Sequence, residues 1–571
     1  STERQIDLDY QKRLHEQFND NYTLYRDFVH INRLTQRQAV NIPLMKETIK
    51  TLLAEIDESP DIYFKNLDNN LEAEYVLNEF WLWMTSKIQF EGLDIQDKKN
   101  VLLYGRSFTK LNFLDNEFAA EVLDIYDVLV DPKTDPLKLD TARHLEHQNI
   151  FRPLREVLAN DKYDEKAKKQ LSELMFSEKG IALSDANKEA LEAKGERLKD
   201  LGVEDYEKKL EDMLAGADVV VSLVEHYTHI WNKKKEEFEK YVVVVAQNEI
   251  VLFKKPLKDV LGVDFCPFVS WAGDLDVSDF WTDGESDIVR VINKVINAWI
   301  SQGTENRTLK NWGMRYYDTS KNFDPQTFTP EPWGWYPVPG NPNDIIKDVA
   351  IQDLGDTIPE IDFLIRIIEK ATATPAGQKG MAEKRQITLG EVQMVVGKAV
   401  ERVKGLTKFY RRARQEFAEK WYAIVDANVA TSKTITLFKT SYKGNVFPKT
   451  VSRKDWKSQA GYKVKVTSTS EQEEEKTTGI QKLIAIKQQF PDNLPLQKIL
   501  QKRLLEIGDL TPEEIKEAQA FEDQKIKQMA AAPIAPPIST PTAIPKRGKL
   551  PREALELQRS TRELRELTPA I

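Results

Sequence analysis

The chain has 571 residues, 41% of them hydrophobic and 30% charged, a composition typical of a soluble globular protein with several packed units. Its net charge of −9, from 91 acidic and 82 basic residues, argues against tight non-specific nucleic-acid binding. This charge does not exclude a protein along which DNA slides, because a protein surface with few cations would not hold the DNA in place. No run of eighteen apolar residues predicts a membrane span, and the polar N-terminus shows no secretory signal.

Helices are predicted in the first hundred residues, where NIPLMKETIKTLLAEI and EAEYVLNEFWLWMTSKI place apolar residues at helical spacing. The period then changes, and VLLYGRSFTKLNFLD (101–115) and EVLDIYDVLVDP (121–132) predict neighbouring strands. Residues 161–216 are dense in Lys, Glu and Leu, which predicts a charged helical insertion that forms a solvated surface lobe.

Strand signals return in DVVVSLVEHYTHIW (218–231), KYVVVVA (240–246) and EIVLFK (249–254), with Gln247-Asn248 as a turn. The apolar run YVVVVA shows no alternation, so we expect it to be covered on both faces. The single cysteine, Cys266, excludes an internal disulfide and is expected to be a buried small hydrophobe. The pattern predicts a mixed α+β fold that is rich in helix.

A long helix is predicted from about Ser286 to Leu309. Its apolar packing stripe comprises Ile288, Ile292, Val295, Ile296 and Trp299, while Arg290, Asn293, Lys294 and Asn297 lie on other, polar faces. Residues 311–348 hold six prolines and eight aromatic residues, which excludes a long helix there. A shorter helix follows in TIPEIDFLIRIIEKA, and the small, basic loop ATATPAGQKGMAEKRQITLGE (371–391) comes next.

The strongest periodic signal follows this loop and predicts a helix roughly 50 to 60 Å long at about 1.5 Å per residue. Its apolar positions are Leu389, Val392, Val396, Ala399, Val403, Leu406, Tyr410, Ala413, Phe417, Trp421 and Ile424. Residues 433–468 are again β-like, and 475–528 indicate helical hairpin material. Residues 529–551, with six prolines, indicate an extended linker, and the last twenty residues indicate a short helix.

No catalytic or metal site is predicted with a complete motif, and no cofactor is expected. The glycine-lysine loop is not a phosphate-binding P-loop, because Gly377 and Gly380 are only three apart and the preceding segment is helical. The pairs His144/His147 and His226/His229 lack further metal ligands, so ordinary hydrogen-bonding histidines are expected. A final set of carboxylates could hold Mg²⁺ or could simply cap a turn before the next helix: Asp274, Asp276 and Asp279.

The order of these elements resembles one protein family, and particular stretches carry the likeness. They are Gly105 to Phe108 running into KLNF, VLVDP at 128–132, the stretch CPFVSWAGDLDVSDFWTDGESDIVRVINKVINAWIS, and ATATPAGQKG leading into ITLGEVQ. Over roughly residues 30–525 the chain resembles the portal proteins, or head-tail connectors, of tailed double-stranded-DNA bacteriophages. The insertion at 161–216 and the proline-rich tail depart from that pattern.

The resemblance implies a portal fold with named parts. These are N-terminal helices and an α/β wing (1–283), a first stem helix (284–310), a clip (311–348), a second stem helix (349–371), a tunnel loop (372–387), a long helix with the rest of the wing (388–470), a helical crown (471–528), and a linker with a C-terminal helix (529–571).

The resemblance also implies the function, which is a ring, usually of twelve subunits, at one capsid vertex, through which DNA is packaged and later ejected. Implied partners are further copies of the chain, double-stranded DNA, the terminase, a head-tail adaptor, and the major capsid and scaffolding proteins, with no membrane. The implied location is the virion, after assembly in the host cytoplasm. Lys379, Lys384 and Arg385 would face DNA in the tunnel, and the clip would dock partners through Trp312, Arg315, Tyr316, Trp333, Trp335 and Tyr336. The alternative is that the aromatic residues of this set pack the clip's own small core or a neighbouring clip.

Two hypotheses from other classes remain open. The first is a metal-dependent enzyme that processes nucleic acid and uses Asp274, Asp276 and Asp279. The second is a monomeric scaffold or adaptor whose proline-rich segments recruit partners.

Overall fold

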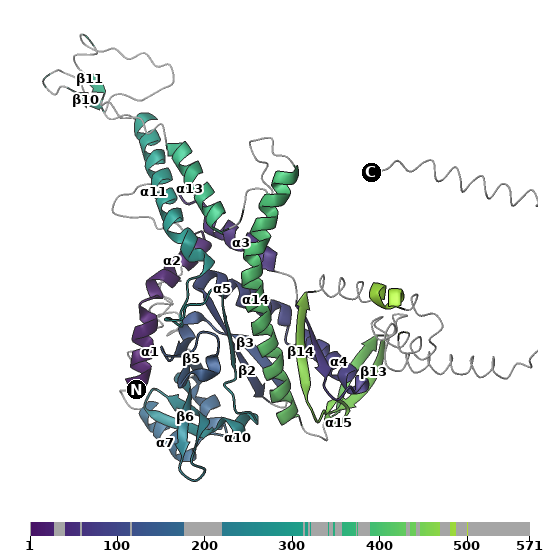
Figure 1. The fold of residues 1–571 in the computed structure, drawn as a ribbon. Coiled ribbons are helices and arrows are strands. Elements are labelled where there is room, and N and C mark those ends of the chain that lie inside the picture. Colours follow the sequence, from purple (N-terminus) through teal and green to yellow (C-terminus); the bar gives the residue numbers. More distant parts are fainter. Residues whose placement is uncertain are drawn as a thin grey trace, which may run out of the picture. The chain divides into compact units, whose positions relative to one another are not determined.

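The protein is seen in a computed structural model, which describes residues 2–27, 40–56, 60–114, 117–175, 220–311, 315–317, 320, 341, 346–348, 357–372, 374, 389–429, 434–440, 446–468, 480–486 and 500. Contacts divide the chain into one unit of residues 1–500 and a second of 501–571, and the second lies outside the described residues. The first unit is mixed α and β, with several antiparallel sheets (Figure 1).

The N-terminal region contains the predicted helices and also a strand that the sequence reading missed. The helices are α1 (Thr2–Lys12), α2 (His15–Tyr25), α3 (Leu44–Ile56), α4 (Leu71–Lys87) and α5 (Phe90–Tyr104). Strand β1 (Pro60–Asn66) lies between α3 and α4, with Ile62 and Phe64 buried and Tyr63 exposed, the alternation of a half-buried strand. It pairs with β14 (Tyr462–Ser468), some four hundred residues further along the chain.

The predicted strand at 101–115 is wrong in its first part, because residues 101–104 are the last turn of α5. Gly105 ends that helix with φ +78°, and a Cβ at this position would lie 1.8 Å from the Thr282 carbonyl oxygen. Strand β2 (Arg106–Leu114) follows and lies between β3 (Glu117–Val122) and β9 (Phe268–Ala272) in an antiparallel sheet. The glycine therefore marks the change from helix to strand.

A five-stranded antiparallel sheet has the strand order β4, β5, β6, β7 and β8, of which the sequence predicted β6, β7 and β8 but not β5. Their bounds are Val128–Val130, His144–Pro153, Val220–Asn232, Glu237–Ala246 and Ile250–Pro256. The predicted strand at 121–132 is only partly right, because its first two residues end β3, a 3₁₀ turn follows, and its last part is β4, which belongs to this sheet and not to that of β2. The predicted turn at Gln247 and Asn248 is confirmed, and both residues have positive φ, as a tight hairpin requires. The expected cover on both faces of YVVVVA is not found, because Val242 and Val244 are buried while Val243 and Val245 keep partial exposure.

Short helices pack on this sheet: α6 (Leu154–Ala159), α7 (Glu165–Met175) and α10 (Leu257–Leu261), with 3₁₀ turns at Ile125–Asp127 and Leu139–Thr141. Helix α7 lies at the start of the predicted charged insertion, and it buries Leu171 and Met175 in a small core with Leu223 and Val244. Residues 176–216 of the insertion lie outside the described residues.

The predicted long helices are confirmed as α11 (Glu285–Asn311) and α14 (Leu389–Asn428), and the shorter one as α13 (Thr357–Thr372). At 40 residues α14 is about 60 Å long. Its positions Tyr410, Phe417 and Trp421 lie in the core with Trp81 of α4. The β-like region contains β12 (Thr434–Thr440), β13 (Val446–Ser452), α15 (Arg453–Trp456) and β14, and β10 (Arg315–Tyr317) pairs with β11 (Ile346–Asp348).

Candidate functional site

Helix α11 is fastened to the body by polar side chains that bind backbone groups. The Asn293 Oδ1 atom accepts a hydrogen bond from the Met45 amide at 3.1 Å, and Asn297 Oδ1 accepts one from the Ile42 amide at 3.0 Å. Ser286 donates to the Leu103 carbonyl at 2.6 Å. The sequence suggested that the polar residues of this helix face away from the packed side, but these asparagines fix α11 to the first turn of α3 and to the residues just before it.

The apolar stripe of α11 is divided between the core and the surface. Ile296 is completely buried, and Ile292 and Trp299 pack against the core in part. On the adjacent side, Ile288 and Val295 are each 36% exposed. Val291 is 61% exposed, and it lies on the same face because it follows Ile288 by three residues and precedes Val295 by four. One flank of the helix thus shows a row of β-branched residues to the solvent.

Helix α13 lies beside α11 (Figure 1) and has the same two-sided character. Ile361 and Ile368 are buried in the core that receives Ile296. Phe363, at 64% exposure, and Ile367, four residues later, lie on a second, uncovered face. An exposed phenylalanine on a short helix costs solvation free energy unless another surface covers it.

Most residues assigned to the clip and the tunnel lie outside the described part of the chain. These are Trp312, Trp333, Trp335 and Tyr336, and Lys379, Lys384 and Arg385. Arg315 and Tyr316 lie in β10, where their backbones pair with Asp348 and Lys347 of β11. The structure therefore pairs residues near the two ends of the 311–348 segment, which connects α11 to α13 in the sequence.

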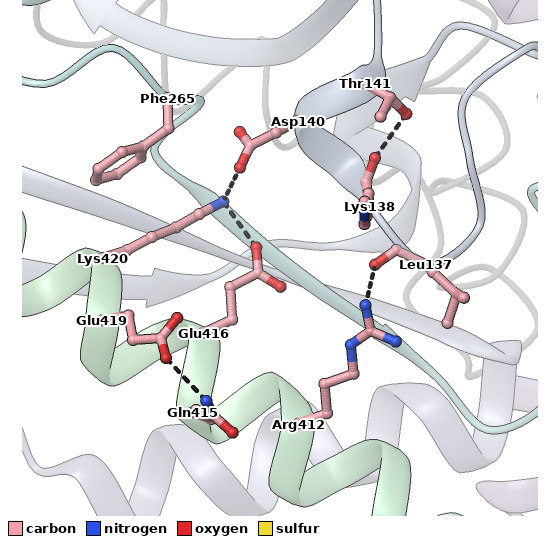
Figure 2. Close-up of a pocket in the computed structure, with 10 residues that line it drawn as sticks. All are labelled: Leu137, Lys138, Asp140, Thr141, Phe265, Arg412, Gln415, Glu416, Glu419 and Lys420. Carbon is pink, nitrogen blue, oxygen red and sulfur yellow. Dashed lines mark hydrogen bonds and ion pairs between the residues drawn. The ribbon is translucent and has the colours of Figure 1, made fainter. Parts of the chain in front are cut away.

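A cleft of about 570 Å³ lies between α14 and the segment around the 3₁₀ turn at 139–141 (Figure 2). Lys420 reaches across it, with its Nζ atom 2.8 Å from Glu416 Oε1 and 3.2 Å from Asp140 Oδ2. The same atom donates to the carbonyl of Phe268 at 2.8 Å. Further charges of both signs line the cleft, among them Arg412 and Glu419, so it selects neither anions nor cations.

The titratable groups at this cleft suit anchoring better than catalysis. Burial opposes the charge of Lys420, but Glu416 and Asp140 outweigh that effect and raise the pKa of its ammonium group. Burial also raises the pKa of the neighbouring Cys266 thiol to about 12. A protonated lysine and an un-ionised thiol are both poor nucleophiles. Lys420 thus fastens α14 to the start of β9.

The three carboxylates considered for Mg²⁺ make separate contacts. Asp274 accepts from the Leu275 amide at 2.8 Å, and Asp276 accepts from the Ser278 amide at 2.9 Å. Asp279 accepts hydrogen bonds from Tyr10 in α1 and from Arg13 just after that helix, and these bonds link the turn to the C-terminal end of α1. This arrangement matches the turn-capping alternative rather than a shared cation site.

The four histidines of the two HxxH pairs lie on β5 and β6 and bind neighbours from several elements. His144 Nε2 is 2.7 Å from Asp7, His147 lies 3.1 Å from Lys110 Nζ, and His226 Nδ1 is 2.9 Å from Glu146. Within the part of the chain that is described, no three His, Cys, Asp or Glu side chains are grouped so that they could hold a metal ion.

Sequence reasoning missed a buried ionic cluster that joins α14 to α5. Arg414 binds Asp94 Oδ1 at 2.8 Å and also binds Asp97, and Lys98 binds Asp94 Oδ2 at 2.7 Å. Tyr410 donates to Asp94 at 2.7 Å. The signal was present, because Arg414 lies four residues after Tyr410 and three before Phe417, on the apolar face of the helix.

Neither the known protein-family models nor the curated proteins include a match to this chain. Across the described residues, every helix is either too short or too polar to cross a membrane.

Proposed function

We propose that the chain is a bacteriophage portal protein, which assembles into a ring at one capsid vertex and conducts double-stranded DNA during packaging and ejection. The observation that carries this proposal is the exposed apolar flank on the helix pair α11 and α13, formed by Val291, Val295, Phe363 and Ile367. Two paired helices that each bury one face and leave a second apolar face open suit contact with further copies of the chain.

The order of elements around this pair supports the proposal. Helix α11, the β10–β11 pair, α13 and the 40-residue α14 follow one another as the first stem helix, clip, second stem helix and long helix would. In a ring, each subunit contacts the next through two different surfaces, and the rotation between neighbours must bring the last subunit back to the first. The apolar faces of α11 and α13 provide two such different surfaces. The net charge of −9 suits a channel that lets DNA pass.

The proposal is tested by the oligomeric state of the purified full chain. Light scattering should give a mass of many subunits, and negative-stain images should show closed rings with a central hole. A protein that stays monomeric at high concentration would contradict the ring proposal and favour the scaffold alternative. Metal-dependent nuclease activity that Asp276→Asn abolishes would favour the enzyme alternative instead.

The tunnel assignment gives a separate prediction. Replacing Lys379, Lys384 and Arg385 together by Ala should leave rings intact and reduce the DNA packaged or retained per particle, because each subunit loses three phosphate contacts. The effect should be measured over a salt series, since loss of these contacts flattens the salt dependence of DNA binding.

A matched control removes three lysines elsewhere. Lys233, Lys234 and Lys235 lie at the exposed turn between β6 and β7, so their triple Ala variant makes the same change in net charge. It should retain DNA as the unmodified protein does. Equal losses in both triple variants would mean that net charge, and not the loop, governs passage.

A further inference from the structure

Helix α1 packs on the five-stranded sheet through polar residues that are almost completely buried. Asp7 and Gln11 are each 1% exposed. Gln11 donates to the carbonyl oxygens of Ile125 at 2.7 Å and Val128 at 3.0 Å. Because buried polar groups stabilise only when they are paired, the attachment of this helix depends on those partners.

Charged residues make the rest of this contact. Asp7 Oδ2 lies 2.7 Å from His144 Nε2, and Arg4 Nε lies 3.3 Å from Glu146 Oε2. Glu146 also binds His226 at 2.9 Å, and the two histidine rings are stacked with their centroids 6.1 Å apart. Helix α1 contributes Arg4 and Asp7, whereas the sheet contributes the histidines and Glu146.

The charge balance of this cluster depends on the proton carried by His144. Asp131, which follows β4, and Glu3 of α1 also act on its imidazole. Burial opposes the protonated form, but the hydrogen bond and charge of Asp7, together with the charges of Asp131 and Glu3, outweigh burial and raise the pKa of His144. Without that proton, the carboxylate of Asp7 faces a neutral ring, and Asp131 and Glu3 lose a neighbouring positive charge.

We propose that α1 is a pH-responsive latch, held on β4 and β5 while His144 is protonated and loosened when that proton is lost at higher pH. The raised pKa fixes the direction of the effect. A histidine whose pKa is higher in the docked state stabilises that state fully below its ordinary value of about 6.5, and it loses this contribution as the pH rises through the docked value. The proposal is independent of ring formation, because none of these residues lies on α11 or α13.

Hydrogen exchange of the full chain tests the latch. Amide protection of residues 2–12, corrected for the intrinsic rate at each pH and divided by that of α3, should fall severalfold as the pH rises from about 6, below the ordinary histidine value, to about 8.5. His144→Gln should remove this pH dependence. Asp7→Asn should reduce it, because the neutral amide no longer favours the imidazolium and only the more weakly acting Asp131 and Glu3 remain.

The control variant is Asp9→Asn, which removes an exposed carboxylate from the same helix and should leave the pH dependence unchanged. A protection ratio that stays constant with pH in the unmodified chain would overturn the latch. The same slope in Asp7→Asn as in the unmodified chain would overturn it too. If His144→Gln loses protection throughout β5 and β6, it has failed to fold, and Asp7→Asn decides the question.

Discussion

Replacing Arg414 by Met should lower the free energy of unfolding by about 3 to 5 kcal/mol, because a buried ion-pair network that loses one partner retains uncompensated charge. Arg414 and Asp97 are each 2% exposed at their side chains, and Asp94 is 7% exposed. Burial opposes the charge on Arg414, but Asp97 and Asp94 outweigh it and raise the pKa of the guanidinium. Methionine fills a similar volume without neutralising either carboxylate.

Urea unfolding followed by tryptophan fluorescence measures this effect, since Trp271 and Trp421 lie in the core beside the cluster. Arg412→Met, an exposed position on the same helix, is the control and should change stability by less than about 0.5 kcal/mol. Adding Asp97→Asn to Arg414→Met should recover part of the loss, because it removes one of the orphaned charges. Equal midpoints for the Arg414 and Arg412 variants would show that the cluster contributes little to stability.

Periodicity predicted the long elements because their signal is local. Helix α14 was found from apolar residues three and four apart, and the β7–β8 hairpin from two apolar runs around Gln247 and Asn248. Strand β1 was missed because its partner β14 lies some four hundred residues away, and no local pattern specifies such a pairing. The final turn of α5 was read as strand, because VLLY has high β-propensity and the contact of Gly105 with Thr282 is tertiary.

The candidate site was only partly predictable for a related reason. The stripe on α11 could be read from spacing, but its division into buried Ile296 and exposed Val295 depends on where α3 and α13 lie. The same holds for Asn293 and Asn297, whose polar groups bind backbone from another segment. A sequence shows which residues share a helical face, whereas the neighbours of that face come from long-range packing.

Introducing a carboxylate on the exposed flank of α11 or α13 should abolish ring assembly. Val291→Asp and Phe363→Asp each place a charge where the proposed contact between copies would exclude water, at a cost of several kcal/mol per interface. A loss of about 3 kcal/mol weakens each contact by roughly a hundredfold, and a closed ring repeats that loss at every interface. Light scattering should then show subunits or short oligomers.

Because both side chains are more than 60% exposed in the single chain, the fold of the subunit should persist, with a circular dichroism spectrum and a thermal midpoint close to those of the unmodified chain. The matched control is Val277→Asp, which adds the same charge at a fully exposed turn position and should leave rings unaffected. Normal rings from both flank variants would place the contact between copies elsewhere. If the Val277 variant also fails to form rings, added charge alone prevents assembly. That result would contradict a specific interface at α11 and α13.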